Sequence, residues 1–186
     1  AEGEDERVLR AAQVLLEEGS GKPILIGRPQ IIESRLQRFG LRIRPGVDFD
    51  LVNPEDDPRY RDYVEDYFAL VGRMGINPEA ARTIVRTNNT VIGALAVRRG
   101  DADALICGVE GRFDRHLRDV GQIIGKKPGV RAFSGLSLLI SQRGAIFFTD
   151  TFVTYNPSAA EIAEMTILAA QEIRRFGITP RAALIS

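Results

Sequence analysis

Helical and strand patterns alternate along this chain, and no other feature of the sequence restricts its fold as strongly. The short apolar run PILIG (23–27) follows one amphipathic helical stripe, and FDLVNP (49–54) follows a second stripe. Parallel strands need crossover connections of this kind, whereas antiparallel strands need only a short turn. The alternation therefore predicts an α/β fold of the three-layer α/β/α type, in which a mostly parallel sheet lies between helices.

The alternation continues through a long helical region into a further apolar run. Residues 59–99 carry a helical pattern that breaks near Gly75 and before Pro78, where Asn77 suits an N-cap and the proline a first helical position. The run ADALICG (102–108) is typical of a third buried strand, and helical spacing resumes after it. Open parallel sheets bind ligands beyond the carboxyl ends of their strands, so the end of this run is a candidate site.

The character of the sequence changes at GKKPGVRAFSG (125–135), a connection rich in glycine, proline and lysine. Two apolar runs follow it, LSLLIS (136–141) and AIFFTD (145–150), and only the letters QRG separate them. Such a short connection predicts a β-hairpin. The hairpin marks the beginning of a second structural unit.

We divide the chain into a first α/β domain, residues 1–130, and the start of a second α/β domain, residues 131–186. The second domain continues into a long helix, announced by a capping box of Ser158 and Glu161. The apolar run 182–186 then predicts a strand whose edges and faces would remain uncovered. We therefore expect the second domain to be truncated and the chain to be a fragment.

Composition and charge exclude several functional classes. The 44% of apolar residues suffice for a packed core, and 25 basic against 25 acidic residues argue against non-specific binding of nucleic acid. The sequence shows neither an apolar run of about 20 residues nor a signal peptide, so we expect a cytoplasmic protein without a membrane partner. A single cysteine, Cys107, excludes an internal disulfide, and a single histidine, His116, leaves no Cys/His cluster for zinc.

The segment richest in possible chemistry is the turn after the expected third strand. Gly108 and Gly111 allow the backbone to approach an anion closely, at the point where a helix presents unpaired N–H groups. Four nearby side chains can add charge-assisted hydrogen bonds to a phosphate: Arg112, Arg115, His116 and Arg118. The segment therefore predicts an anion site.

A purely structural interpretation of the same segment stays open. Asp114 with Arg118, and Arg115 with Asp119, have the i,i+4 spacing of exposed helical ion pairs, each worth about 0.3–0.5 kcal/mol. His116 suits a helix surface better than a general base. Cys107 is expected to be a small buried thiol, because the chain has no second histidine to activate it.

Several longer motifs resemble the phosphate acetyl/butyryl transferase family. They are GDADALICG, QIIG, KPGV and FTDTFVTYNPSAAEIAEMTILAAQEIRRFGITPRAALIS, so the likeness covers nearly the whole chain. Four further motifs resemble the acyltransferase-like C-terminal domain of bacterial hybrid NADP-dependent malic enzymes: AEGEDERVLRAAQ, PILIGRP, LVNPEDDPRYRDY and VRTNNTVIGAL. The resemblance implies two α/β domains like those of isocitrate dehydrogenase, with coenzyme A in the cleft between them.

The resemblance also implies a ligand and its binding residues. The family's two coenzyme-binding arginines correspond to Arg73, in LVGRMGINPEAAR, and to Arg118, in HLRDVGQIIG. Acetyl-CoA or CoA is the implied ligand, and Gly108, Gly111 and Arg115 belong to the adjoining anion-binding turn. The acetyltransferases' catalytic serine and aspartate have no counterpart here, and NADP and a divalent metal would bind only in the missing part of a malic enzyme.

Three functions are consistent with this resemblance. Active acetyltransferases usually carry a small, hydroxyl-rich turn after the strand glycine, whereas VEGRFDRHLR is bulky and charged and would crowd an acetyl or phosphate group. This difference favours a regulatory region that binds acetyl-CoA and inhibits the distant site where a malic enzyme oxidatively decarboxylates malate. A catalytic phosphate acetyltransferase and a mainly structural oligomerisation domain are the alternatives. In each case we expect a homo-oligomer, because the apolar face of a truncated domain needs a partner.

Overall fold

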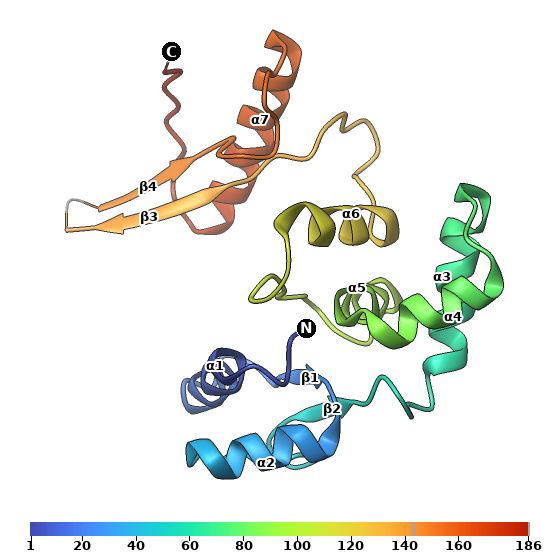
Figure 1. The fold of residues 1–186 in the computed structure, drawn as a ribbon. Coiled ribbons are helices and arrows are strands. Elements are labelled where there is room, and N and C mark those ends of the chain that lie inside the picture. The colour runs from blue at the N-terminus through green and yellow to red at the C-terminus, as the bar shows by residue number, and fades with distance from the viewer. Residues whose placement is uncertain (143, 186) are drawn as a thin grey trace. The chain divides into compact units, whose positions relative to one another are not determined.

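The computed structural model describes residues 1–142 and 144–185. The chain divides into two compact units, Ala1–Gly125 and Lys126–Ser186 (Figure 1). The sequence analysis predicted the boundary between the two domains near residue 130. Each unit is described by itself below.

The first unit has helices and a small parallel sheet, which confirms the α/β class. Its elements are α1 (Glu6–Glu17), β1 (Ile24–Ile26), α2 (Pro29–Phe39), β2 (Asp50–Val52), α3 (Tyr60–Val71), the 3-10 helix η1 (Gly72–Met74), α4 (Pro78–Thr87), α5 (Asn89–Arg99) and α6 (Phe113–Ile123). β1 and β2 pair in parallel, with Ile24 opposite Asp50 and Ile26 opposite Val52. These are the two strands that the runs PILIG and FDLVNP predict.

The prediction of a third strand at residues 102–108 is wrong, because this segment forms no strand and pairs with none of the described strands. The N-terminal residues take the place beside β1 instead (Figure 1). The N–H of Gly3 donates to the carbonyl of Ile26 (3.0 Å), and the nitrogen of Ala1 donates to the carbonyl of Ile106 (2.6 Å). Single hydrogen bonds of this kind connect three backbone segments without forming a ladder. A β-carbon on Gly3 would lie 2.7 Å from the Ile26 oxygen, so the close approach requires glycine.

Most helix boundaries lie where the sequence signals predict them. Pro29 and Pro78 stand at the first positions of α2 and α4, and Gly40 ends α2 in the left-handed conformation at φ 65°. One boundary was not predicted: the helical pattern 59–99 also breaks at Asn88. The side chain of Asn88 caps α5, so the chain changes direction there while the apolar spacing continues.

The core of the first unit forms two clusters. One cluster centres on α5, whose residues Thr90 to Ala96 are all buried and which contacts β1, α3, α4 and α6. The other cluster joins α1 and α2 around Phe49, which is fully buried. A helix that is buried all round must have neighbours on every side, so α5 is the element that positions the segments around it.

The second unit contains the predicted hairpin and long helix. β3 (Ser137–Ser141) pairs with β4 (Gly144–Phe148) in antiparallel orientation, and residue 143 of the predicted loop lies outside the described residues. α7 (Ala159–Arg175) begins with the capping box that Ser158 and Glu161 predict. Phe147 of β4 packs against Phe176 after α7, with ring centroids 5.5 Å apart.

The strand predicted at the end of the chain is wrong as far as the structure describes it. Residues 182–185 are exposed and pair with no described strand. An apolar run forms a strand only where another strand lies alongside to pair with it. Residue 186 lies outside the described residues. Among the helices in the described part of the chain, none has the length and hydropathy to cross a membrane.

Candidate functional site

The candidate anion site is the turn that joins Cys107 to α6. Gly108 and Gly111 have φ angles of 105° and 91°, which L-residues with side chains rarely adopt. Gly111 is further restricted, because a β-carbon there would lie 3.0 Å from Nε2 of His116. Both glycines are therefore required by the shape of the turn.

The His116 side chain connects this turn to α5 by two hydrogen bonds. Its Nδ1 lies 2.8 Å from the hydroxyl oxygen of Thr90, and its Nε2 lies 2.7 Å from the carbonyl oxygen of Glu110. A neutral imidazole that donates from Nε2 and accepts at Nδ1 satisfies both contacts. The half-buried imidazole thus has a structural role. This agrees with the sequence-based expectation that His116 is not a general base.

The N-terminal residues also hold the turn. We predicted from the sequence that the N–H of Gly108 binds an anion. In the structure it donates to the Glu2 carboxylate at 2.8 Å. Arg7 donates from its guanidinium to the carbonyl of Val109 at 3.3 Å. A carboxylate therefore already occupies the Gly108 amide, and a phosphate would have to displace it. Burial raises the pKa of the Cys107 thiol beside this turn, which keeps the thiol protonated.

The charged side chains of α6 pair differently from the sequence prediction. Asp114 pairs with Arg112 (3.0 Å), and the hydrogen bonds from this guanidinium hold the pKa of the Asp114 carboxyl below its usual value. Asp119 is only 6% exposed and accepts a 2.7 Å hydrogen bond from the Asn88 side chain. Arg118 is 62% exposed, with Nε 3.6 Å from an Asp119 oxygen.

The predicted pairs Asp114–Arg118 and Arg115–Asp119 are therefore wrong in the described structure, because each carboxylate has another partner. The spacing of residues within α6 does not show which side of this helix packs against α5. The face that carries Asp119 lies against the start of α5, where Asn88 reaches it.

The remaining predicted site residues lie at separate positions. Arg115 is exposed on the first turn of α6. Arg73 is exposed in η1, at the connection between α3 and α4. Within residues 1–142 and 144–185, no hydrogen bond or ion pair links Arg73 to the turn or to Arg118. The structure thus brings Gly108, Gly111 and the start of α6 together and leaves Arg73 on another element.

Three residues that shape the site were not predicted from the sequence: Glu2, Asn88 and Thr90. The letters NNT after a helical stripe are a typical N-cap signal, and they would have identified Asn88. The contact between Glu2 and Gly108 spans 106 positions, so local patterns carry no signal for it.

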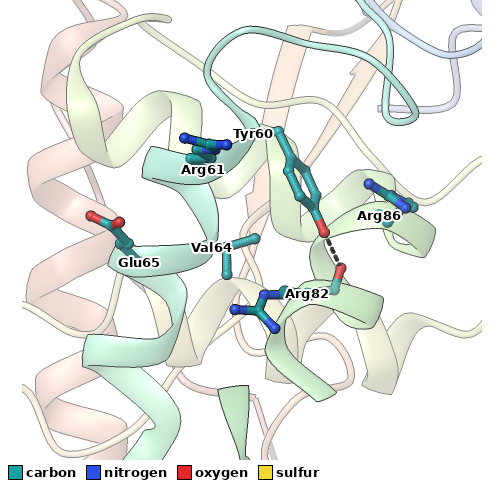
Figure 2. A pocket seen from close by; sticks show the side chains of 6 residues that line it. All are labelled: Tyr60, Arg61, Val64, Glu65, Arg82 and Arg86. Carbon is teal, nitrogen blue, oxygen red and sulfur yellow. Dashed lines mark hydrogen bonds between the residues drawn. The ribbon is translucent and has the colours of Figure 1, made fainter. Parts of the chain in front are cut away.

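A separate basin of about 640 Å³ lies open to solvent between α3 and α4. Figure 2 shows the side chains that line it, namely Tyr60, Arg61, Val64 and Glu65 from α3, and Arg82 and Arg86 from α4. The Tyr60 hydroxyl donates to the backbone carbonyl of Arg82 at 2.9 Å. Its basic lining distinguishes this basin from the apolar core.

Comparison with known proteins identifies the family. The model of the family described as phosphate acetyl/butaryl transferase matches residues 1–186, which is the whole chain. The chain belongs to this family. The resemblance of its motifs to phosphate acetyl/butyryl transferases is thereby confirmed.

The relatives that the chain matches include longer malic enzymes. The chain is 81% identical over 186 residues to the NAD-dependent malic enzyme of Rhizobium meliloti (strain 1021), and 47% identical over 185 residues to the NADP-dependent malic enzyme of Escherichia coli (strain K12). In both comparisons the whole chain aligns with 24% of the relative. The chain thus spans about a quarter of the length of these malic enzymes.

A solved structure of this family has the same fold. The phosphotransacetylase from Streptococcus pyogenes matches with a TM-score of 0.88 and 30% identity, over 100% of this chain and 55% of that chain. This likeness confirms the α/β fold class. The chain covers about half of that structure.

Proposed function

We propose that this chain is part of a regulatory region of a malic enzyme and that Arg118 contributes to a site for the phosphates of acetyl-CoA or CoA. The supporting observation is the 81% identity over the whole chain to a malic enzyme. The relatives include enzymes named for NAD and for NADP, so we propose malic enzyme activity of the longer protein without a choice of nicotinamide coenzyme.

The geometry around Arg118 supports this assignment. Arg118 lies in the middle of α6, and its guanidinium is 62% exposed and can reach a phosphate; its 3.6 Å pair with Asp119 orients it without covering it. Asp119 is in turn fixed by Asn88, so the support of the arginine comes from α5. Arg115, one turn of helix earlier on the same exposed element, adds positive charge to the approach.

The bulky turn after Gly108 favours regulation over acyl transfer. Glu110 and Arg112 are exposed in the turn, and the Glu2 carboxylate already occupies the Gly108 amide. A negatively charged acetyl phosphate would meet a carboxylate there. A site that binds the coenzyme without turning it over can act on a distant active site only through a coupling free energy between the two sites.

The test is acetyl-CoA inhibition of malate oxidation by a full-length malic enzyme that carries this sequence. Replacing Arg118 by alanine should raise the acetyl-CoA concentration for half-maximal inhibition about ten-fold to a hundred-fold, because one charge-assisted hydrogen bond is lost. The matched control is Arg10→Ala, which removes an exposed arginine paired with Glu6 on α1. This control should shift the inhibition less than about two-fold.

Equal inhibition of wild type and Arg118→Ala, with unchanged uninhibited rates, would contradict the assignment of Arg118.

A catalytic phosphate acetyltransferase is the second candidate, favoured by the likeness to the Streptococcus pyogenes phosphotransacetylase. Formation of acetyl phosphate from acetyl-CoA and phosphate by the full-length protein, at about 1–1000 per second, would establish this candidate in place of regulation.

A further inference from the structure

We propose that the basin between α3 and α4 binds the polyphosphate group of a small anionic ligand, at a site distinct from the turn before α6. The basin is lined by the beginning of α3 and the end of α4 (Figure 2). Arg73 lies at the opposite end of this helical pair, in the connection that joins the two helices. The proposal does not depend on coenzyme binding at Arg118.

The charge of the basin lining is unbalanced. Arg61, Arg82 and Arg86 contribute three guanidinium groups, and Glu65 is the single carboxylate among the lining residues. In the part of the chain that the structure describes, none of these arginines forms an ion pair with a carboxylate. Arg82 and Arg86 are also one helical turn apart, a spacing at which like charges destabilise a helix slightly. A bound anion would relieve this repulsion.

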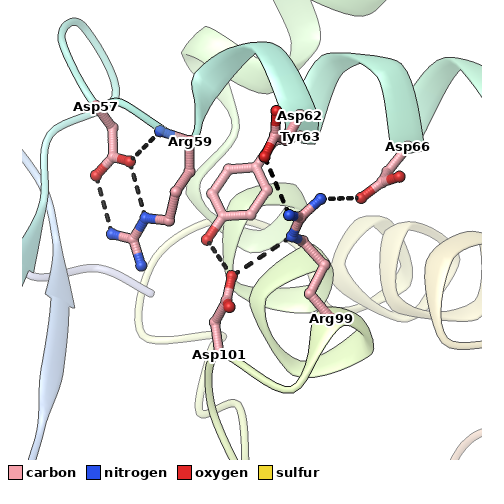
Figure 3. Close-up of polar contacts among 7 residues, drawn as sticks. All are labelled: Asp57, Arg59, Asp62, Tyr63, Asp66, Arg99 and Asp101. Atoms are coloured by element: carbon pink, nitrogen blue, oxygen red, sulfur yellow. Dashed lines mark hydrogen bonds and ion pairs between the residues drawn. The ribbon is translucent and has the colours of Figure 1, made fainter.

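The aspartates of α3 pair with an arginine outside the basin. Asp62 and Asp66 of α3 both accept hydrogen bonds from Arg99, at 3.1 and 2.6 Å, and Asp101 lies 3.6 Å from the same guanidinium (Figure 3). The Tyr63 hydroxyl donates to Asp101 at 3.1 Å and completes this network. The single guanidinium of Arg99 thus faces three carboxylates on this side of α3, while the basin side carries three arginines and one carboxylate.

Two of the lining side chains, Tyr60 and Arg86, are held by defined contacts. The hydrogen bond from Tyr60 to the Arg82 carbonyl holds the phenol ring, and the Arg86 guanidinium lies 4.8 Å from the ring centroid. A cation–π contact orients the guanidinium without cancelling its charge, so hydrogen-bond donors remain for a ligand. Val64 adds an apolar surface between the charged groups (Figure 2). Such preorganisation lowers the entropy that binding costs.

A polyphosphate fits this lining better than a single phosphate does. Guanidinium groups bind phosphate oxygens in bidentate geometry, and several arginines around one basin can each engage a different phosphate. The volume of about 640 Å³ is within the usual range for small-molecule sites. Inorganic triphosphate and the triphosphate of a nucleotide share this chemistry, and the experiment separates them.

The experiment is calorimetric titration of the full-length protein with inorganic triphosphate, and in a second arm with ATP, at low ionic strength. The basin variant is Arg61→Gln with Arg82→Gln, and the control variant is Arg38→Gln with Arg42→Gln, two exposed arginines near the end of α2. We expect wild type and control to bind triphosphate equally. The basin variant should bind at least ten-fold more weakly, because two charged donors are removed.

Comparison of the two ligands identifies the source of the polyphosphate. Equal affinity for triphosphate and ATP would show that the phosphates alone are recognised, and tighter ATP binding would show that the nucleoside contacts the basin. Either result, combined with weakening in the basin variant, supports the proposal. Binding should also fall as salt is added, since the lining is exposed.

Three results would overturn the proposal. They are an absence of triphosphate binding by wild type, equal weakening in the basin and control variants, and loss of binding in Arg118→Ala but not in the basin variant. The last result would place the anion at the proposed coenzyme site. Circular dichroism and the uninhibited malate oxidation rate verify that each variant folds. Acetyl-CoA inhibition of the basin variant should match wild type, so failure here is distinguishable from failure of the proposed function.

Discussion

At the scale of single residues, Asp119 shows how burial changes the meaning of a charge. Helical spacing placed it on an exposed face opposite Arg115, whereas the folded chain buries it and gives it Asn88 as a partner. A buried carboxylate needs hydrogen-bond donors, because the uncompensated charge would be costly. Its hydrogen bond to Asn88 comes from the packing of α5 against α6, which the spacing within α6 does not describe.

Glu4 is a residue whose charge should stabilise the first unit in a pH-dependent way. Its carboxylate accepts hydrogen bonds from the Arg28 backbone at 3.0 Å and from the guanidinium at 2.9 and 2.8 Å. The guanidinium hydrogen bonds hold the pKa of Glu4 below the ordinary value of 4.5. Because the folded-state pKa is lowered, this stabilisation is present above about pH 4.5 and is lost as the pH falls through the folded-state pKa.

Replacing Glu4 by glutamine should therefore lower the free energy of unfolding by about 0.5–1.5 kcal/mol at pH 7. The difference from wild type should shrink as the pH falls below 4.5. Urea denaturation at several pH values measures both effects. Glu6→Gln is the control, because it removes only an exposed pair with Arg10 worth a few tenths of a kcal/mol. A difference that stays constant down to pH 2 would refute the assigned role of the charge.

At the scale of elements, the break between α4 and α5 depends on one asparagine. The Asn88 oxygen accepts from the N–H groups of Thr90 (3.1 Å) and Val91 (3.3 Å), while its amide nitrogen donates to Asp119. One side chain thus caps the start of α5 and donates to a buried carboxylate, while the Asn88 backbone N–H donates to Ile84 at the end of α4. Asn77 caps α4 in a simpler way, accepting only from the N–H of Ala80 at 2.8 Å.

We expect Asn88→Ala to lower the free energy of unfolding by about 2–4 kcal/mol, through loss of the cap and of a donor to buried Asp119. The matched variant Asn77→Ala loses only a cap and should cost about 1 kcal/mol. Urea denaturation of both variants measures the comparison. Equal destabilisation would mean that the hydrogen bond to Asp119 adds nothing to the cap.

At the scale of the whole molecule, the hairpin of the second unit carries several exposed apolar side chains close together in sequence. The exposed apolar side chains of the hairpin are Leu138, Leu139, Ile140, Ile146 and Phe148. The first unit buries a core in two clusters, and it also exposes apolar side chains such as Val47 and Ile106. We propose that the hairpin surface takes part in a homo-oligomer.

The full-length protein should therefore sediment as a dimer or a larger species at micromolar concentration. Ile140→Glu places a charge on the hairpin at a side chain that is 77% exposed, and it should increase the monomer fraction at least several-fold. Val47→Glu, at a 62% exposed position of the first unit, is the control and should leave the distribution unchanged. A monomeric wild type, or equal dissociation in both variants, would contradict the proposal.

The sequence by itself determined most of the helices, the strands β1 to β4 and the family. Periodicity, the prolines that begin α2 and α4, and the capping box before α7 depend on neighbouring residues, so they can be recognised without a fold. The parallel strands β1 and β2 were predicted for the same reason. The motif resemblance then supplied the family, which the match over the whole chain confirmed.

Only the tertiary structure decided which segments and charges meet. Residues 102–108 have the apolar pattern of a strand, yet residues 1–3 lie between them and β1, because backbone pairing depends on which segment is alongside. The sequence predicts that the Gly108 amide faces an anion, yet in the structure it donates to Glu2, which lies 106 positions earlier in the chain. Asp119 meets Asn88 rather than Arg115, because α5 covers one side of α6. Contacts between residues distant in sequence have no local signal, and these contacts set the chemistry of the candidate site.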